Sequence, residues 1–168
     1  MTSLPLTKPL LAALATGVIA LILINHTIWQ KERILSHGRL IYLPLAPVDP
    51  RSIMQGDYMT LQFALVDDLT QKIEQTRSAT TVALLNVDPR GVAHLAALGT
   101  QKPTAQQVRF RYRHDNNGVR FGTDAFFFQE GHAQHYEAAR FGGFRVDADG
   151  HALLTDLYDD KLRRLGTP

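Results

Sequence analysis

Hydrophobic and polar residues follow two different patterns along this 168-residue chain. From Pro9 to Ile28 the sequence PLLAALATGVIALILINHTI contains no Asp, Glu, Lys or Arg. About twenty residues, at roughly 1.5 Å each in a helix, span the ~30 Å hydrocarbon core of a bilayer. After residue 38 apolar residues instead alternate with polar ones, which is the period of β-strands. The pattern therefore predicts one membrane-spanning helix followed by a β-rich domain.

The apolar segment is expected to remain in the protein as a signal anchor. A cleavage site needs small residues at the end of the apolar run, whereas Ala13–Ala15 lies near its beginning. Trp29 follows the run at the depth of the membrane interface, and the sequence QKER begins the aqueous part. The expected organisation is a short tail over 1–8, a transmembrane anchor over 9–29, a juxtamembrane helical extension over 30–38 and an extracytoplasmic β domain over 39–168.

The charges that flank the apolar run say little about its orientation. Basic residues stand on both sides, Lys8 before the run and Lys31 and Arg33 after it, so the positive-inside bias is small. A short tail, one apolar helix and a large carboxyl-terminal domain are typical of bacterial envelope proteins tethered by their N-terminus. We therefore expect a single-pass protein of the bacterial inner membrane with its C-terminal domain in the periplasm.

Short segments with a two-residue period predict the strands of the domain. Turn sequences beginning with aspartate lie between them: DPRS at Asp49, DPRG at Asp88, DNNG at Asp115 and DADG at Asp147. The turns at Asp88 and Asp115 are expected to connect hairpins, and FRVDADGHALL predicts a last hairpin. The expected strands lie in RLIYLPLAPV, DYMTLQFALV, TTVALLNV, VAHLAAL, QVRFRYRH and VRFG.

Two segments are predicted to be short helices. The first is DDLTQKIEQTR, with Asp67 or Asp68 as its N-cap, and the second is QEGHAQHYEAARF, which is rich in good helix formers. The predicted fold is therefore mainly β: an antiparallel barrel-like or sandwich domain with one or two short helices, preceded by one N-terminal transmembrane helix.

The segment GDYMTLQF, Gly56 to Phe63, combines a bend with an alternating strand. Its Met59, Leu61 and Phe63 are expected to face the core, and Tyr58, Thr60 and Gln62 the opposite side. The segment resembles the signature of the GDYXXLXY family. Gly56, Asp57, Tyr58 and Leu61 match that signature, and Phe63 stands where it has tyrosine, so an aromatic packing role is kept and a hydroxyl is not.

The resemblance extends over nearly the whole chain. It includes the N-terminal membrane helix, the DPRS sequence, and the segment FFFQEGHAQHYEAARFGGFRVDADGHALL from Phe126 to Leu154. It implies a membrane-anchored domain commonly encoded beside polytopic membrane proteins, and it implies no reaction. We therefore expect a non-catalytic accessory or binding subunit, without a cofactor, that docks on a polytopic inner-membrane protein. Structural or binding roles are expected for Asp49, Arg51, Glu130, Tyr136 and Arg140.

A membrane-anchored serine hydrolase is the alternative. The sequence SIMQGD, from Ser52 to Asp57, resembles in part the Ser-Met-x-Pro and Gly-Asp elements of type I signal peptidases. Ile53 stands in place of the methionine and no proline follows. Ser52 as nucleophile would also need a general base within hydrogen-bond reach, and the lysines after the anchor all lie in polar segments. An enzyme is therefore the less favoured class.

His132 and His135 are the candidate metal ligands. They stand three residues apart on the second expected helix, near Glu130 and Glu137, but no HExxH motif is present and paired histidines on a polar helix are usually solvated. We expect no metal site. On the same helix Arg140 should share a face with Tyr136 and could pair with Glu137, or with Asp57 if it is buried.

Composition argues against nucleic-acid binding and against chemistry that needs cysteine. The chain after the anchor holds all 16 acidic residues and all but one of the 18 basic residues, so it is nearly neutral and lacks the charge of a nucleic-acid-binding domain. In QVRFRYRH, Phe110 and Tyr112 alternate with three arginines, which predicts a half-exposed strand, with a binding face for an acidic lipid or an acidic partner as the alternative. The absence of cysteine excludes disulfides, CxxCH haem attachment and thiolate metal sites.

Overall fold

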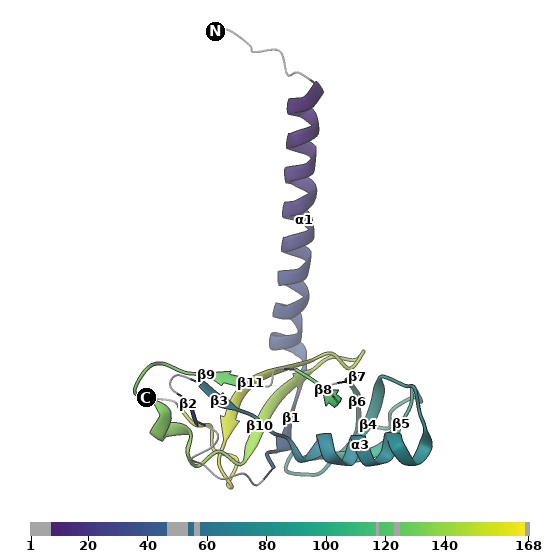
Figure 1. Ribbon diagram of the computed structural model, residues 1–168, viewed down its shortest axis with the longest axis vertical. Helices are drawn as coiled ribbons and strands as arrows, with labels where there is room; N and C mark the ends of the chain where they lie inside the picture. Colours follow the sequence, from purple (N-terminus) through teal and green to yellow (C-terminus); the bar gives the residue numbers. More distant parts are fainter. Residues whose placement is uncertain (1–7, 47–53, 56–57, 117, 123–124, 167–168) are drawn as a thin grey trace.

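The computed structural model describes residues 8–46, 54–55, 58–116, 118–122 and 125–166. Helix α1 (Lys8–His37) rises away from a domain of short strands and one further helix (Figure 1). The segment Ala13–His37 is long and apolar enough to cross a membrane, and the domain buries none of it. The chain therefore has one N-terminal helix that could span a bilayer.

Helix α1 continues without a break to the edge of the domain. Gly38 follows it, donates its N–H to Ile34 O at 2.8 Å, and accepts a hydrogen bond from Arg145 Nη1 at 2.9 Å. A Cβ on Gly38 would lie 3.0 Å from the backbone N of Val146, so no larger residue fits there without movement. The helix is thus joined to the β domain through a buried glycine.

Antiparallel strands make up the domain, as the alternating sequence predicts. In the described residues they form three three-stranded sheets and one hairpin, and these sheets are not closed into a barrel. Isolated bridges, Tyr42 to Val92 and Leu45 to Phe63, connect the sheets. The strands are β1 (Arg39–Pro44), β10 (Phe141–Val146) and β11 (Ala152–Tyr158) in the first sheet; β2 (Met54–Gln55), β3 (Tyr58–Thr60) and β9 (Ala125–Phe127) in the second; β5 (Ala93–Leu98), β4 (Val82–Val87) and β6 (Gln107–Arg111) in the third; and β7 (Arg113–Asp115) with β8 (Gly118–Arg120).

The predicted hairpins at Asp88, Asp115 and Asp147 are confirmed, since β4–β5, β7–β8 and β10–β11 are antiparallel neighbours. Asp88 and Asp147 close their turns in the same way, and Asp159 closes a third. In each turn the carboxylate Oδ1 accepts hydrogen bonds of 2.8–2.9 Å from the backbone N–H groups two and four residues ahead. The residue three positions ahead has a positive φ: Gly91 at 89°, Gly150 at 90° and Leu162 at 58°.

The first predicted helix is confirmed as α3 (Ala64–Thr76), but its predicted start is wrong. The helix begins at Ala64, and its N-cap is Phe63 in extended geometry, without a side-chain cap. Asp67 lies inside the first turn, where a carboxylate still interacts favourably with the helix dipole. Leu65, Leu69 and Ile73, four residues apart, form the buried stripe. This apolar stripe, and not a polar cap, determines where the helix begins.

The second predicted helix is wrong. Of QEGHAQHYEAARF, only the single 3-10 turn η1 (Ala133–Tyr136) is helical. The backbone after η1 forms hydrogen bonds with other segments of the chain. Arg140 N–H donates to Tyr158 O at 2.8 Å, and Arg140 O accepts from Leu45 N–H at 2.9 Å. Strand pairing here overrides a favourable helix propensity, as tertiary contacts commonly do.

The core is centred on four phenylalanine rings from different elements. Phe63, Phe110, Phe121 and Phe144 lie with ring centroids 5.0–6.1 Å apart in tilted or edge-to-face pairs, which is the favoured range for aromatic contacts. We call this set the core aromatic cluster. Strand β6 contributes Phe110 and is followed by buried Tyr112, and the intervening Arg111 is exposed, which confirms the predicted half-exposed strand.

Candidate functional site

The described residues of the GDYMTLQF segment lie partly in the interior and partly at the surface of the domain. Leu61 and Phe63 are buried, Phe63 within the core aromatic cluster, so the expected packing role of this ring is confirmed. Tyr58, in β3, is half-buried on the opposite side of the chain. Gly56 and Asp57 lie outside the described residues. The described part of the signature therefore supplies both core residues and a surface aromatic.

Phe127 is the outward neighbour of Tyr58. The two residues are direct cross-strand partners in the β3–β9 pair, with ring centroids 5.9 Å apart. The Phe127 side chain is 74% exposed, and among the described residues beyond α1 no other large hydrophobic side chain is exposed. Together with Tyr58, this ring presents apolar surface to water, and exposed apolar patches commonly mark contact surfaces. We call Tyr58 and Phe127 the outer aromatic pair.

The neighbours of Phe127 in the sequence pack against Tyr136. Phe126 and Phe128, which alternate with Phe127, each place a ring centroid 5.2 Å from that of Tyr136 in η1. Tyr136 in turn packs against Gly166, where an added Cβ would collide with the tyrosine hydroxyl. Tyr136 therefore has a packing role: it supports β9 and so determines how the outer aromatic pair is presented.

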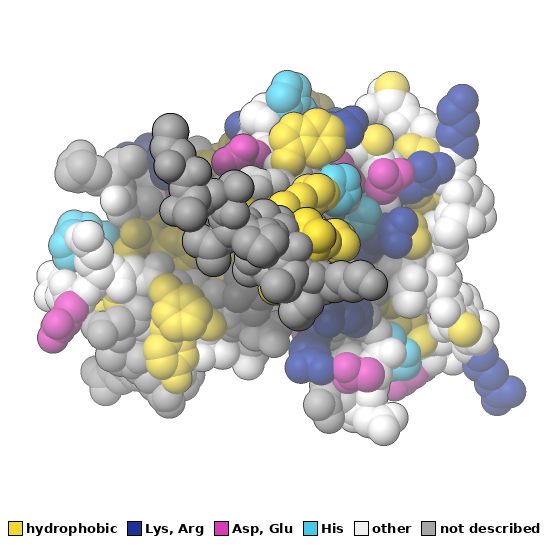
Figure 2. Space-filling model, turned by 90° about the horizontal axis from the view of Figure 1, so that it is seen from above, with side chains coloured by type: hydrophobic (Ala, Val, Ile, Leu, Met, Phe, Trp, Pro, Cys, Tyr) yellow, Lys and Arg dark blue, Asp and Glu magenta, His cyan; other side chains and the backbone are white. Residues whose placement is uncertain are grey.

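The outer aromatic pair lies near the face from which α1 rises. Figure 1 shows β9 at the level of the helix base, while α3 lies on the far side of the domain. Viewed along α1, the same face shows a group of hydrophobic side chains to the left of the helix, on the side where Figure 1 places β9 (Figure 2). A membrane around α1 would therefore lie above this region.

The structure does not bring the predicted site residues that it describes together into one site. Asp49, Arg51 and Ser52 lie outside the described residues, as does the Asp57 carboxylate proposed to meet Arg140. Glu130 is exposed. Arg140 is exposed too, and its Nη1 donates to Ala139 O at 2.7 Å. In the part of the chain that the structure describes, Arg140 forms no ion pair with Glu137, so the pairing expected from a continuous helix is wrong.

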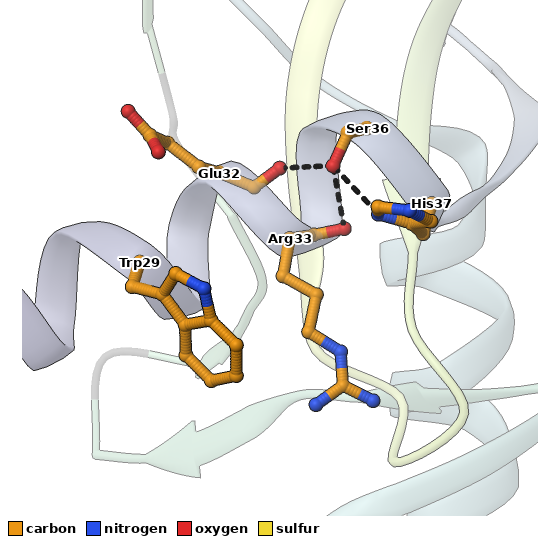
Figure 3. A pocket seen from close by; sticks show the side chains of 5 residues that line it. All are labelled: Trp29, Glu32, Arg33, Ser36 and His37. Carbon is orange, nitrogen blue, oxygen red and sulfur yellow. Dashed lines mark hydrogen bonds between the residues drawn. The ribbon is translucent and has the colours of Figure 1, made fainter.

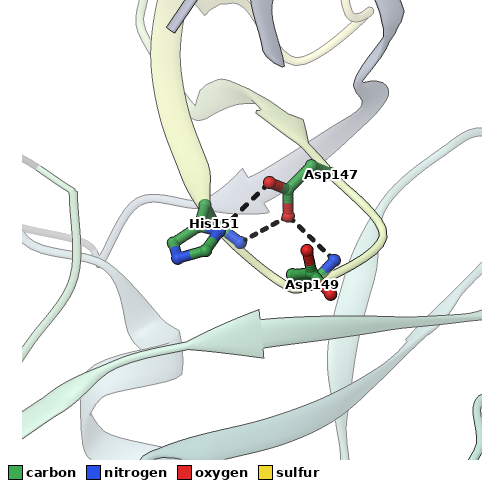
Figure 4. Close-up of side chains that lie close together, drawn as sticks. All are labelled: Asp147, Asp149 and His151. Carbon is green, nitrogen blue, oxygen red and sulfur yellow. Dashed lines mark hydrogen bonds and ion pairs between the residues drawn. The ribbon is translucent and has the colours of Figure 1, made fainter. Parts of the chain in front are cut away.

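The two candidate metal ligands lie close together, and no third ligand joins them among the described residues. The rings of His132 and His135 are 5.1 Å apart and both are exposed. Among the described residues, the group of three potential ligands occurs instead at the β10–β11 turn, where Asp147, Asp149 and His151 place ligand atoms within 4.8 Å of one another (Figure 4). Asp147 already accepts both N–H groups of its turn, and its Oδ2 lies 3.1 Å from His151 Nδ1. This cluster is accounted for as a turn cap.

A cleft at the base of α1 has no counterpart in the sequence interpretation. Its volume is about 310 Å³, and Trp29, Glu32, Arg33, Ser36 and His37 line it (Figure 3). The Arg33 guanidinium carbon lies 5.7 Å from the centroid of the Trp29 ring, within cation–π range. The spacing of Trp29 and Arg33, four residues apart on a helix, could have indicated this contact.

The perturbed acid–base groups of the described residues belong to the framework of the fold. Backbone donation from Arg163, with further hydrogen bonds from the Arg163 side chain and the Lys161 N–H, lowers the pKa of Asp159. Burial raises the pKa of Tyr112 and of Tyr158, which lie in the interior. These shifts arise from a turn cap and from core packing.

Comparison with known proteins supports the resemblance seen in the sequence. The family model described as GDYXXLXY protein matches residues 20–157, which include the carboxyl half of α1, the signature and most of β11. No curated protein and no solved structure matches the chain. Since the matched segment covers most of the 168 residues, the chain belongs to the GDYXXLXY family.

Proposed function

We propose that this protein is a non-catalytic accessory subunit of the bacterial inner membrane, which docks on a polytopic membrane protein through α1 and the outer aromatic pair. In this proposal the domain lies in the periplasm. The observation that carries the proposal is the 74% exposure of Phe127, paired with the signature residue Tyr58 near the face from which α1 rises.

Helix α1 supports the proposal because it offers apolar surface on every side. The large apolar side chains in the middle of the helix are all more than half exposed: Leu14, Val18, Ile19, Leu21, Ile22, Leu23 and Ile24. A helix that is hydrophobic all round is stable only where lipid or other apolar helices surround it. Such a helix can bind laterally to the transmembrane helices of a partner.

The outer aromatic pair supplies the contact outside the bilayer. Aromatic side chains that fill a partner's pocket dominate many interfaces, and truncation of such a residue commonly costs about 2 kcal/mol or more. Since β9 lies at the level of the helix base, a partner that surrounds α1 could also reach Phe127. The two surfaces would then act as one interface, and their effects on affinity would reinforce each other.

Purification of the full-length protein in mild detergent, with mass spectrometry of the proteins that accompany it, tests this function. A stoichiometric multi-pass protein is expected with the wild type and with Phe127→Tyr, which keeps the ring. Phe127→Ala should reduce its recovery by at least tenfold. Gln75→Ala, an exposed position in α3 on the far side of the domain, is the matched control and should have no effect.

Two results would contradict the proposal. A wild-type protein that purifies without any multi-pass partner would remove the subunit role. Undiminished recovery of the partner with Phe127→Ala would remove the outer aromatic pair from the interface while leaving α1 as the remaining contact.

The periplasmic placement has its own test. The chain contains no cysteine, so Gln75→Cys introduces a single thiol. A membrane-impermeant maleimide should label this thiol in intact spheroplasts as completely as after lysis. Labelling that requires lysis would place the domain in the cytoplasm.

A further inference from the structure

The cleft at the base of α1 has the chemistry of an anion site. Arg33 contributes a guanidinium and Trp29 an indole N–H, and both side chains project to the same side of the helix (Figure 3). In the part of the chain that the structure describes, neither group has a hydrogen-bond or ion-pair partner. The ring of Trp29 holds the guanidinium above it, which leaves the N–H groups of Arg33 available for a ligand.

The remaining lining residues do not neutralise this cation. Glu32 is the acidic member of the lining, and its carboxylate points away from the Arg33 guanidinium (Figure 3). Ser36 Oγ lies 2.7 Å from Glu32 O and 2.7 Å from His37 Nδ1, so these groups satisfy one another at the lower end of the cleft. Arg33 therefore presents an uncompensated positive charge.

The depth of these residues along α1 identifies the ligand. Trp29 directly follows the uncharged run that ends at Ile28, and at roughly 1.5 Å per residue Arg33 lies about 6 Å beyond Trp29. The headgroup layer of one leaflet is about 5–8 Å thick outside the hydrocarbon core. Trp29 and Arg33 thus fall in the layer that contains lipid phosphates, which planar guanidinium groups bind through two parallel hydrogen bonds.

We propose that Trp29 and Arg33 bind the phosphodiester of an anionic phospholipid, with the guanidinium and the indole N–H donating to its oxygens. The lipid is a bound ligand of this chain and would fix the depth and rotation of α1 in the bilayer. The proposal shares with the proposed function the requirement that α1 crosses a membrane, but it needs no protein partner. Failure to find a partner protein in the purification would therefore not contradict the lipid proposal.

Native mass spectrometry of the full-length protein in detergent, titrated with phosphatidylglycerol, tests the site. Arg33→Ala should weaken lipid binding at least about tenfold, because it removes charge-assisted hydrogen bonds to the phosphate. Trp29→Phe keeps the ring and removes the N–H, and should weaken binding about two- to fivefold. Lys31→Ala removes the same charge from a residue that does not line the cleft, and should change binding less than twofold.

The other arms separate the possible ligands. Diacylglycerol, which lacks the phosphate, should not bind above the level seen with Arg33→Ala. Displacement of phosphatidylglycerol by inorganic phosphate would overturn the proposal in favour of a free anion. Equal losses with Arg33→Ala and Lys31→Ala would also overturn it, because they would show unspecific charge attraction. Circular dichroism should show unchanged helix content in each variant, since the substituted side chains are exposed.

Discussion

The core aromatic cluster and the outer aromatic pair contain the same kind of side chain in opposite environments. Phe63 and Phe144 are buried with ring centroids 5.3 Å apart, whereas Phe127 lies tilted against Tyr58 at 5.9 Å and remains 74% exposed. Phe63 and Tyr58 both belong to the family signature and lie five positions apart. The comparison teaches that one short signature can combine a residue needed for folding with a residue available for binding. The two groups should respond differently to substitution.

Removal of a core ring should have the largest effect on stability. Phe144 is fully buried and contacts the three other rings of the core aromatic cluster. Phe144→Ala should lower the free energy of unfolding by about 3–5 kcal/mol, because it removes buried apolar surface and leaves a cavity. Urea denaturation followed by circular dichroism measures it. If this variant does not fold, Phe144→Leu should fold with a smaller loss; a loss below about 1 kcal/mol for Phe144→Ala would contradict the central role of the cluster.

Overpacking the same cluster should have the next largest effect. A Cβ on Gly142 would lie 2.7 Å from Phe63 Cε1 and 3.1 Å from Leu154 Cδ1. Gly142→Ala should therefore destabilise the domain by about 1–3 kcal/mol. Gly17→Ala in α1 is the matched control, since its Cβ would meet nothing within 4 Å. Equal unfolding midpoints for the two variants would show that the ring of Phe63 has room to move.

Low pH should remove the contribution of Asp159 to the stability of the domain. Its turn joins the sheet that holds Phe144 to the segment that supports the outer aromatic pair. Asp159 is buried, and its turn leads from β11 in the core to Gly166, against which Tyr136 supports β9. The folded-state pKa of Asp159 is lowered, so its contribution to stability is present above the unfolded pKa of about 3.9 and is lost as pH falls through the folded value. Asp159→Asn should be less stable than the wild type at pH 7, and the difference should shrink below pH 4. A difference independent of pH would show that the charge of Asp159 contributes nothing.

Removal of a buried hydroxyl should raise stability slightly, in contrast to the losses expected above. The Tyr112 hydroxyl is buried and, in the part of the chain that the structure describes, has no hydrogen-bond partner. Tyr112→Phe removes an unsatisfied polar group and should leave stability unchanged or raise it by up to about 1 kcal/mol. Thermal unfolding of the two proteins side by side measures the shift. A loss above about 1 kcal/mol would indicate that the hydroxyl has a partner in solution.

Substitution in the outer aromatic pair should have the smallest effect on stability. Phe127→Ala removes an exposed side chain, and the free energy of unfolding should change by no more than about 0.5 kcal/mol. The measurement is the same urea titration used for Phe144→Ala. A loss comparable to that of a core ring would show that Phe127 is part of the folding core, and the division between the two groups of rings would then fail.

Local pattern was sufficient for much of the fold but not for the candidate site. The inward positions of Met59, Leu61 and Phe63 follow from the two-residue period alone, and all three are buried. The exposure of Phe127 could not be read from FFFQ, because three consecutive phenylalanines hide the alternation, and only pairing with β3 determines which ring faces outward. Arg140 was misplaced for a similar reason, since its backbone pairs with residues distant in the sequence. Contacts of long sequence separation are invisible to a local periodicity.

The junction at Gly38 has a mechanical consequence. A single residue, Gly38, separates the helix from β1, and this glycine is buried and hydrogen-bonded on both sides, to Ile34 within the helix and to Arg145 in β10. With one residue between the anchor and the domain, and with that residue hydrogen-bonded on both sides, we expect the two to move together. A protein or lipid that changes the tilt of α1 in the bilayer would swing the whole domain through the same angle, and displacement would grow with distance from the membrane.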